Sequence, residues 1–242
     1  MAAEPQITAQ ERILVALDVD NVTAALHLAK DLAGVVGGFK VGLELVNAVG
    51  FDVFTMLKDA GVDRIFYDAK FHDIPTTVKG AVTAAAKRGV WMVNVHAGGG
   101  SDMLRAAADA AHSVTHPPLL IGVTVLTSLS TAALNRDLRV LGDVNDHVLH
   151  LATMSQACGL NGVVCSPHEV RSIREICGTS FQTVVPGVRP RGVATNDQAR
   201  VATPEEAIAN GASYLVIGRA ITSAVSPRQA AIAIAAAIEL GL

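Results

Sequence analysis

The sequence is poor in cysteine and in aromatic residues, and it has no excess of either charge. Its three cysteines, Cys158, Cys165 and Cys177, form no Cys-x-x-Cys pair. This excludes a disulfide framework and indicates free thiols in a reducing compartment. Lysine and arginine number 19 against 22 aspartates and glutamates, which gives a net charge of −3. Such a balance argues against nucleic acid or a membrane surface as a partner.

No segment has the pattern of a secretory signal or of a membrane span. Residues 1–12 are polar, and the apolar run from Ala230 to Ile238 is too short to cross a bilayer. We therefore expect a cytoplasmic protein. With 242 residues, 50% of them hydrophobic, the chain can bury a large core without a metal or a disulfide. We expect one domain over residues 1–242.

Short β-branched apolar runs alternate with segments of helical spacing along the chain. Continuous apolar strands of this kind are typical of parallel sheets covered on both faces. The predicted strands are Ile13–Leu17, Phe39–Val41, Arg64–Tyr67, Met92–Val95, Leu119–Val125, Gly162–Cys165, Thr183–Val185 and Tyr214–Ile217. The predicted helical segments are Val22–Leu32, Val78–Arg88, Asp102–His112, His147–Cys158, Glu169–Cys177 and Pro204–Asn210. This repetition predicts an α/β fold, a (β/α)8 (TIM) barrel.

A doubly wound sheet is the alternative fold. It is disfavoured because Asp18–Asn21 follows the first strand, where a glycine-rich dinucleotide motif would stand. The loop from Thr127 to Asp146 is long enough to be a lid, or to hold a short helix. Helix caps are predicted at Asn21, Ser101, Ser166, Thr203 and Ser226, with Pro167, Pro204 and Pro227 in the following first turns.

Polar residues stand at the carboxyl ends of the predicted strands, where the site of a parallel barrel lies. These residues are Asp18, Lys40, Asp68, Lys70, His96, Thr127, Arg189 and Arg219. Charges at buried strand ends are costly unless they are paired, so this pattern indicates a ligand site.

The densest group of charges runs from Tyr67 to Pro75. In an extended strand, Asp68 and Lys70 would point to the same face, and Asp73 would follow the strand end. One interpretation is a structural ion pair. The other is a charge array facing a ligand, with Lys40 joining from the second strand, because a lysine flanked by carboxylates stays protonated.

A phosphate site is predicted in the loops after the seventh and eighth strands, which often bind phosphate in such barrels. Arg189 follows the seventh strand, and Gly218 and Arg219 follow the eighth. Glycine lets the backbone approach an anion, and arginine can bind it bidentately. The alternative is that Gly218 forms a turn and Arg219 is a surface charge.

Together, these motifs resemble those of the orotidine 5′-phosphate decarboxylases in their compact bacterial form. The resemblance rests on Asp68-x-Lys70-x-x-Asp73-Ile74-Pro75-x-Thr77, with Leu17-Asp18, Phe39–Gly42, Val125–Ser128, Pro186–Pro190 and Ile217–Arg219 in the same order. It implies a (β/α)8 homodimer that needs no cofactor and no metal. It also implies the conversion of orotidine 5′-monophosphate to UMP and carbon dioxide in pyrimidine biosynthesis.

The resemblance further implies a role for each matched residue. Lys70 would protonate C6 of the pyrimidine. Asp68 would press on the substrate carboxylate and hold Lys70. Lys40 would complete the charge network and contact the ribose. The other implied roles are ribose binding by Asp18, pyrimidine contact by Thr127, phosphate binding by Arg189, Gln198, Gly218 and Arg219, and completion of the neighbouring subunit's site by Asp73 and Thr77.

Two other functions remain as alternatives. One is a magnesium-dependent sugar-phosphate lyase of the same superfamily, which would share Asp-x-Lys-x-x-Asp but is disfavoured by the continuation to Thr77 and by Gln198. The other is a phosphate-binding barrel without catalysis, which the intact charge set disfavours. His147 and His150 have the spacing of a metal pair on a helix, but no third ligand is evident.

Overall fold

Eight parallel strands close into a barrel in the computed structural model, which describes residues 7–190 and 202–241. Each strand pairs with the next one along the chain, and β8 returns to pair with β1. The strands are β1 (Ile13–Ala16), β2 (Gly38–Val41), β3 (Ile65–Phe71), β4 (Met92–His96), β5 (Leu119–Val123), β6 (Gly162–Val164), β7 (Gln182–Pro186) and β8 (Tyr214–Ile217). The predicted (β/α)8 barrel is confirmed, and every predicted strand is present within a few residues of its expected bounds.

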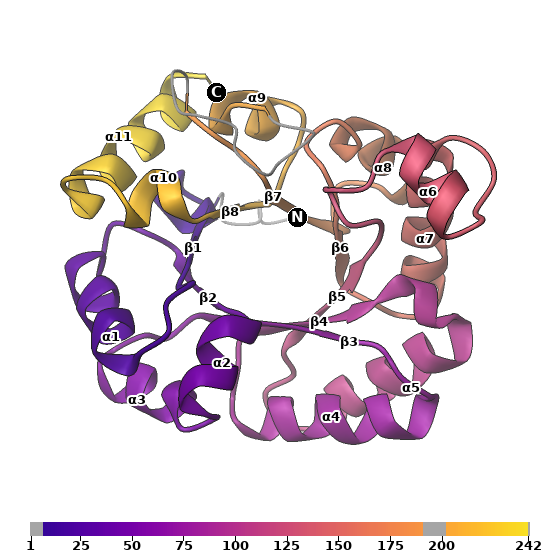
Figure 1. Cartoon of the computed structure of the whole chain (residues 1–242), viewed down its shortest axis with the longest axis horizontal. Coiled ribbons are helices and arrows are strands. Elements are labelled where there is room, and N and C mark those ends of the chain that lie inside the picture. The colour runs from indigo at the N-terminus through magenta and orange to yellow at the C-terminus, as the bar shows by residue number, and fades with distance from the viewer. Residues whose placement is uncertain (1–6, 191–201, 242) are drawn as a thin grey trace, which may run out of the picture.

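The helices form a ring around the outside of the barrel (Figure 1). They are α1 (Val22–Asp31), α2 (Leu43–Val49), α3 (Val53–Asp59), α4 (Pro75–Lys87), α5 (Ser101–His112), α6 (Thr131–Asp137), α7 (Val144–Ala157), α8 (Val170–Cys177), α9 (Pro204–Ala209), α10 (Arg219–Thr222) and α11 (Pro227–Leu240), with short 3-10 turns η1 (Gln10–Arg12) and η2 (Ala97–Gly99). None of the helices in the described part of the chain is long and apolar enough to cross a membrane.

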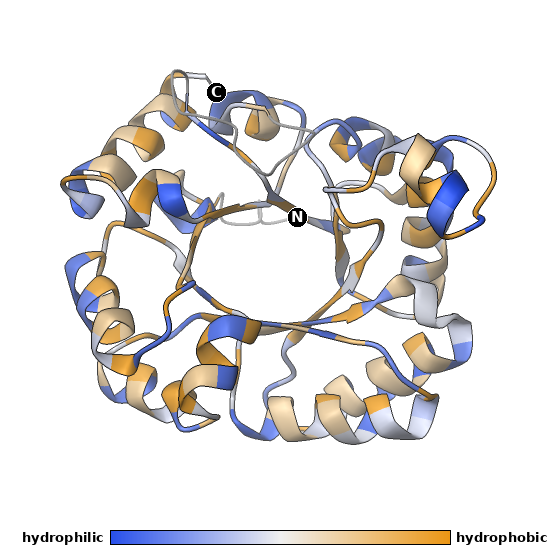
Figure 2. Cartoon of the chain, in the orientation of Figure 1, coloured by the Kyte–Doolittle hydropathy of each residue, from blue (hydrophilic) through white to orange (hydrophobic). Residues whose placement is uncertain are grey.

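Two apolar cores hold the barrel together. The larger lies between the strands and the helices, and the smaller fills the barrel interior. Figure 2 shows hydrophobic residues along the strands and in the surrounding helices. The interior core consists of Leu14, Phe66, Met92, Ile121, Val184 and Tyr214. Because side chains alternate along a strand, the next inward positions towards the carboxyl ends lie above this apolar floor.

Three of the five predicted helix caps are confirmed. Asn21 and Ser226 accept hydrogen bonds from the first turns of α1 and α11, and Thr203 forms a capping box with Glu206. The prediction is wrong at Ser101, which is the first residue of α5 after Gly100 at φ 85°. It is also wrong at Ser166, because α8 begins only at Val170 and Pro167 precedes the helix.

Two connections differ from a simple strand–helix unit. The loop after β5 contains the short helix α6, which Ser130 caps by accepting from the Ala133 N–H. Between β2 and β3 the chain forms α2 and α3, two seven-residue helices that the apolar spacing did not reveal.

Candidate active site

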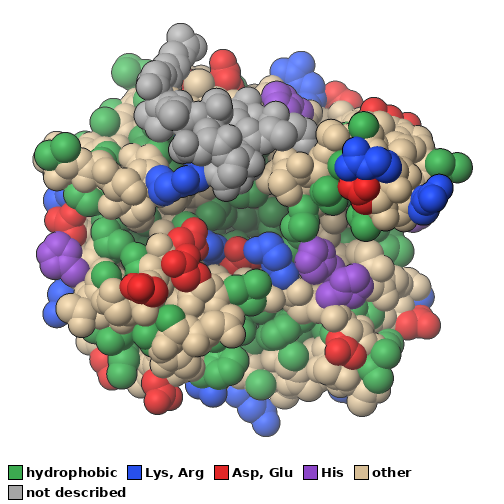
Figure 3. Space-filling model, viewed as in Figure 1, with side chains coloured by type: hydrophobic (Ala, Val, Ile, Leu, Met, Phe, Trp, Pro, Cys, Tyr) green, Lys and Arg blue, Asp and Glu red, His purple; other side chains and the backbone are tan. Residues whose placement is uncertain are grey.

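Above its apolar floor, the barrel interior becomes polar at the carboxyl ends of the strands. Lys40 on β2, Asp68 on β3 and Asn94 on β4 follow the apolar inward positions, and the Lys40 and Asn94 residues are buried. In the space-filling view, basic and acidic side chains gather around the hollow at the centre of this face (Figure 3). The predicted concentration of charge at the strand ends is therefore present.

Lys40 joins two carboxylates from neighbouring strands. Its Nζ atom lies 2.6 Å from Asp18 Oδ1 and 3.7 Å from Asp68 Oδ2. The Lys40 side chain is only 10% exposed, whereas that of Asp18 is 51% exposed. Asp18 thus lies at the open edge of the site, and Lys40 lies deeper, between it and Asp68.

Asp68 also pairs with Lys70, but not through a regular strand. The Lys70 Nζ atom lies 2.7 Å from Asp68 Oδ1. Lys70 has φ 50°, in the left-handed region, and the β3–β4 register shifts between Tyr67 and Phe71. The expectation of an extended strand was therefore wrong here, because a β-bulge aims Lys70 at Asp68.

Asn94, which the sequence reasoning missed, is bonded to both of these residues. Its Nδ2 donates to Asp68 Oδ1 at 2.7 Å, and its Oδ1 accepts from the Lys70 N–H at 2.7 Å. The available signal was a single amide inside the apolar run Met92–Val95, two residues after an inward-facing methionine.

The environment of Asp68 favours its ionised form. Burial is the largest single effect and opposes ionisation. The charges of Lys70 and Lys40, with hydrogen bonds from Lys70 and Asn94, outweigh it and hold the pKa of Asp68 below its usual value. The centre of the site thus combines a fixed anion with two lysines.

His96 ends β4 beside this set. Its ring centroid lies 5.3 Å from that of His72. Burial lowers the pKa of His96 below 6.5, and the nearby His72 and Lys70 lower it further, while Asp68 acts in the opposite direction. The surroundings of His96 thus favour its neutral form.

A cavity of about 210 Å³ opens onto the charged set. Asp68, Lys70 and Thr127 supply its polar groups. Its apolar lining includes Phe66, Val123, Val125, Leu126, Val164, Val184, Pro186 and Val216. A flat ring would find apolar walls here, with charged groups on one side.

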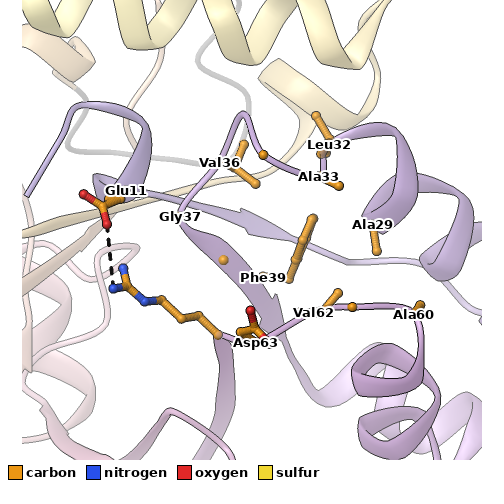
Figure 4. Close-up of a pocket in the computed structure, with 14 residues that line it drawn as sticks. Glu11, Ala29, Leu32, Ala33, Val36, Gly37, Phe39, Ala60, Val62 and Asp63 are labelled. Carbon is orange, nitrogen blue, oxygen red and sulfur yellow. Dashed lines mark ion pairs between the residues drawn. The ribbon is translucent and has the colours of Figure 1, made fainter.

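A separate pocket of about 280 Å³ lies at the opposite, amino-terminal end of the strands. Its lining includes Phe39 and Val62, with Glu11 ion-paired to the guanidinium of Arg64 at its edge (Figure 4). It contains none of the residues predicted for the site.

The residues predicted to bind phosphate lie around β7 and β8. Gly218 follows β8 and lies close to the end of β1, where a Cβ atom on it would lie 3.6 Å from Ala16 Cβ and 4.0 Å from Asp18 Oδ2. Arg219 is exposed and begins α10. Arg189 is buried, and its Nη1 donates to the Val188 carbonyl at 2.9 Å. Gln198 lies outside the described residues.

Asp73 and Thr77 lie on the exposed rim rather than in the charge set of their own barrel. Asp73 Oδ1 accepts from the Ile74 N–H at 2.7 Å, and within residues 7–190 and 202–241 Asp73 makes no ion pair. Thr77 is exposed in the first turn of α4, and Ile74 between them is 66% exposed.

No group of three or more metal-ligating side chains occurs in the part of the chain that the structure describes. His147 and His150 lie along α7 with ring centroids 6.4 Å apart.

A closed parallel barrel in which Asp68 and Lys70 line a cavity, with Lys40 paired to Asp68, has the architecture of a (β/α)8-barrel enzyme. A family model described as "Orotidine 5'-phosphate decarboxylase / HUMPS family" matches residues 11–234. The chain belongs to this family, as the resemblance of its motifs predicted.

Individual relatives agree with this assignment. The orotidine 5'-phosphate decarboxylase of Moorella thermoacetica is 50% identical over 237 residues, covering 96% of this chain and 94% of the relative. The orotidine 5'-phosphate decarboxylase of Idiomarina loihiensis is 50% identical over 216 residues, covering 89% of this chain and 93% of the relative. The crystal structure of orotidine 5'-phosphate decarboxylase from Lactobacillus acidophilus has a TM-score of 0.83 at 38% identity, covering 93% of this chain and 98% of that one.

Proposed function

We propose that this protein decarboxylates orotidine 5′-monophosphate to UMP and carbon dioxide, in pyrimidine biosynthesis. The observation that carries the proposal is the Lys40–Asp68–Lys70 set, of which Asp68 and Lys70 line a cavity with apolar walls, in a chain of this family.

The chemistry explains why these residue types are needed. When the C6–carboxylate bond breaks, its electron pair stays on C6, and the ring offers little delocalisation for it. An ammonium held in place before the reaction stabilises that developing charge. Lys70 then gives its proton to C6, which completes UMP, and recovers a proton from water. No electron carrier takes part, so we expect no cofactor and no metal to be needed.

The remaining polar residues bind the substrate. Thr127 lines the cavity with Lys70 and would contact the pyrimidine. Asp18 and Lys40 would contact the ribose hydroxyls; the Lys40 Nζ atom lies 2.6 Å from Asp18 Oδ1. Arg189, Gln198, Gly218 and Arg219 are proposed to bind the phosphate, as the resemblance implies.

We also propose that the active unit is a homodimer. The exposed Asp73 and Thr77 would then reach the neighbouring subunit's site, close to its Lys70. Their position on the rim, on either side of the exposed Ile74, supports this arrangement. Three buried cysteines that form no disulfide fit the cytoplasmic location expected from the sequence.

The direct test is the loss of ultraviolet absorbance when the purified protein meets orotidine 5′-monophosphate in EDTA. Turnover is expected, and it would also exclude the magnesium-dependent alternative. Binding of UMP without turnover would instead identify a phosphate-binding barrel. Turnover of a sugar phosphate only after magnesium is added would identify the lyase.

A further inference from the structure

The buried side chain of Asn94 joins the backbone of one charged residue to the side chain of another. Asn94 lies in β4 with an exposed fraction of 0%. Its amide group uses both ends: the Nδ2 donates to Asp68 Oδ1, and the Oδ1 accepts from the Lys70 N–H. A neutral amide can do both at once, whereas a carboxylate only accepts and a leucine does neither.

The contact with the Lys70 N–H compensates for an interruption of the sheet. The β-bulge between Tyr67 and Phe71 breaks the regular β3–β4 pairing, and Lys70 within it adopts φ 50°. A buried N–H needs an acceptor, and a lysine in the left-handed region persists only where its surroundings hold it there. The Asn94 carbonyl oxygen provides that acceptor from the adjacent strand.

We propose that Asn94 is a positioning residue that fixes the Lys70 ammonium and the Asp68 carboxylate relative to each other. The inference rests on the function proposed above, in which the place of that ammonium determines the protonation of C6. Asn94 acts through Lys70 and Asp68, so its loss affects the chemical step more than substrate binding.

The variant Asn94→Asp tests this with little change of shape. It places a second carboxylate against Asp68 Oδ1, where the amide lay at 2.7 Å. Two carboxylates so close share a proton with a raised pKa. Below that pKa the protonated oxygen restores the missing donor. Above it the two anions repel each other, and Asp68 moves relative to Lys70.

The expected result is a kcat about 100-fold lower near neutral pH, with KM and UMP affinity changed by less than about 3-fold. The activity of Asn94→Asp relative to that of the wild type recovers as the pH falls. Asn161→Asp is the matched control, because Asn161 Oδ1 accepts from the Leu120 N–H at 2.8 Å at the other end of the barrel. It should leave kcat and the pH profile unchanged. A variant Asn94→Asp with wild-type kcat, or with a pH profile of unchanged shape, overturns the proposal.

A second measurement does not depend on turnover. Hydrogen exchange at the Lys70 amide should be at least about 10-fold faster in Asn94→Leu, which removes the acceptor of the Lys70 N–H, than in the wild type, while the Val93 amide stays protected. Unchanged exchange at Lys70 contradicts the positioning role even if activity falls. A wild-type protein that fails to decarboxylate orotidine 5′-monophosphate contradicts the proposed function instead, and the exchange data still decide whether Asn94 holds Lys70.

Discussion

Lys70 and Asp68 form a 2.7 Å ion pair across a β-bulge, with Lys70 at φ 50°. The backbone here departs from its preferred geometry, at the point where the proposed reaction needs a fixed ammonium. Strained residues persist where surrounding contacts over-determine them. Here those contacts are the Asp68 carboxylate on the side chain and the Asn94 amide on the backbone.

Replacing Lys70 removes both the ammonium and the proposed proton donor. We expect Lys70→Ala to lower kcat by at least about 1,000-fold, since electrostatic stabilisation and proton donation are lost together. Turnover of orotidine 5′-monophosphate and thermal unfolding should be measured side by side. The fold should persist, and Lys79→Ala, at an exposed lysine on α4, should keep wild-type activity. Appreciable activity in Lys70→Ala would remove its assigned role.

Asp73 can be tested by mixing two inactive variants. If Asp73 serves the neighbouring subunit, a heterodimer of Lys70→Ala and Asp73→Ala contains one intact site, built from Lys70 of one protomer and Asp73 of the other. Random reassortment of equal amounts should then restore about one quarter of wild-type activity. No recovery, despite demonstrated subunit exchange, would place Asp73 in the site of its own chain or outside the site altogether.

Gly42 provides the space that the Lys40 ammonium occupies. A Cβ atom on Gly42 would lie 2.8 Å from Lys40 Nζ and 3.6 Å from Asp18 Oδ1. Gly42→Ala should therefore displace Lys40 from its carboxylate partners and lower kcat/KM by about 10-fold or more. Steady-state kinetics and UMP titration should show the loss, with little change in the melting temperature. Unaltered kinetics would mean that Lys40 moves aside without consequence.

The strands were predictable because each one is a buried apolar run flanked by polar residues. The strand Tyr214–Ile217 was predicted with its observed bounds. Local chemistry sufficed at Thr203, where the capping box is complete within the helix start. It failed at Ser166, where Glu169 accepts from the Ser166 N–H just as Glu206 accepts from the Thr203 N–H. The Ser166 hydroxyl, however, has no hydrogen-bond partner among the described residues, and α8 starts only at Val170. The motif Ser-x-x-Glu alone does not distinguish the two cases.

The site was predictable in its composition but not in its geometry. Lys40, Asp68 and Lys70 were identified as charged residues at strand ends, because burying a charge is costly unless it is paired. The left-handed conformation of Lys70 was not foreseeable, because lysine rarely adopts it and the cause is the contact with Asn94 on another strand. A contact between residues on two different strands produces no repeating pattern in the sequence from which it could be predicted.

The pH dependence of stability should report on His96. Its pKa is lowered from 6.5 in the fold, so just below that pH the unfolded chain binds more protons than the folded one. The free energy of unfolding therefore falls as the pH falls through this window, and it is independent of this site at higher pH. His96→Gln should lose less stability than the wild type between about pH 7.5 and about pH 5.5 in urea titrations. His27→Gln, at an exposed position on α1, should follow the wild type; an identical slope for all three proteins would contradict the assignment to His96.

Arg219 should matter only for substrates that carry the phosphate. Loss of one charge-assisted contact costs about 1.5–3 kcal/mol, so we expect Arg219→Ala to lower kcat/KM for orotidine 5′-monophosphate by about 10- to 150-fold, mainly through KM. Orotidine, which lacks the phosphate, should be turned over equally slowly by Arg219→Ala and by the wild type. Arg171→Ala, at an exposed arginine on α8, is the control for a general loss of positive charge and should change neither rate. Equal losses on both substrates would show that Arg219 affects the fold or the part of the site that binds the pyrimidine. No loss on either substrate would show that Arg219 does not bind the phosphate.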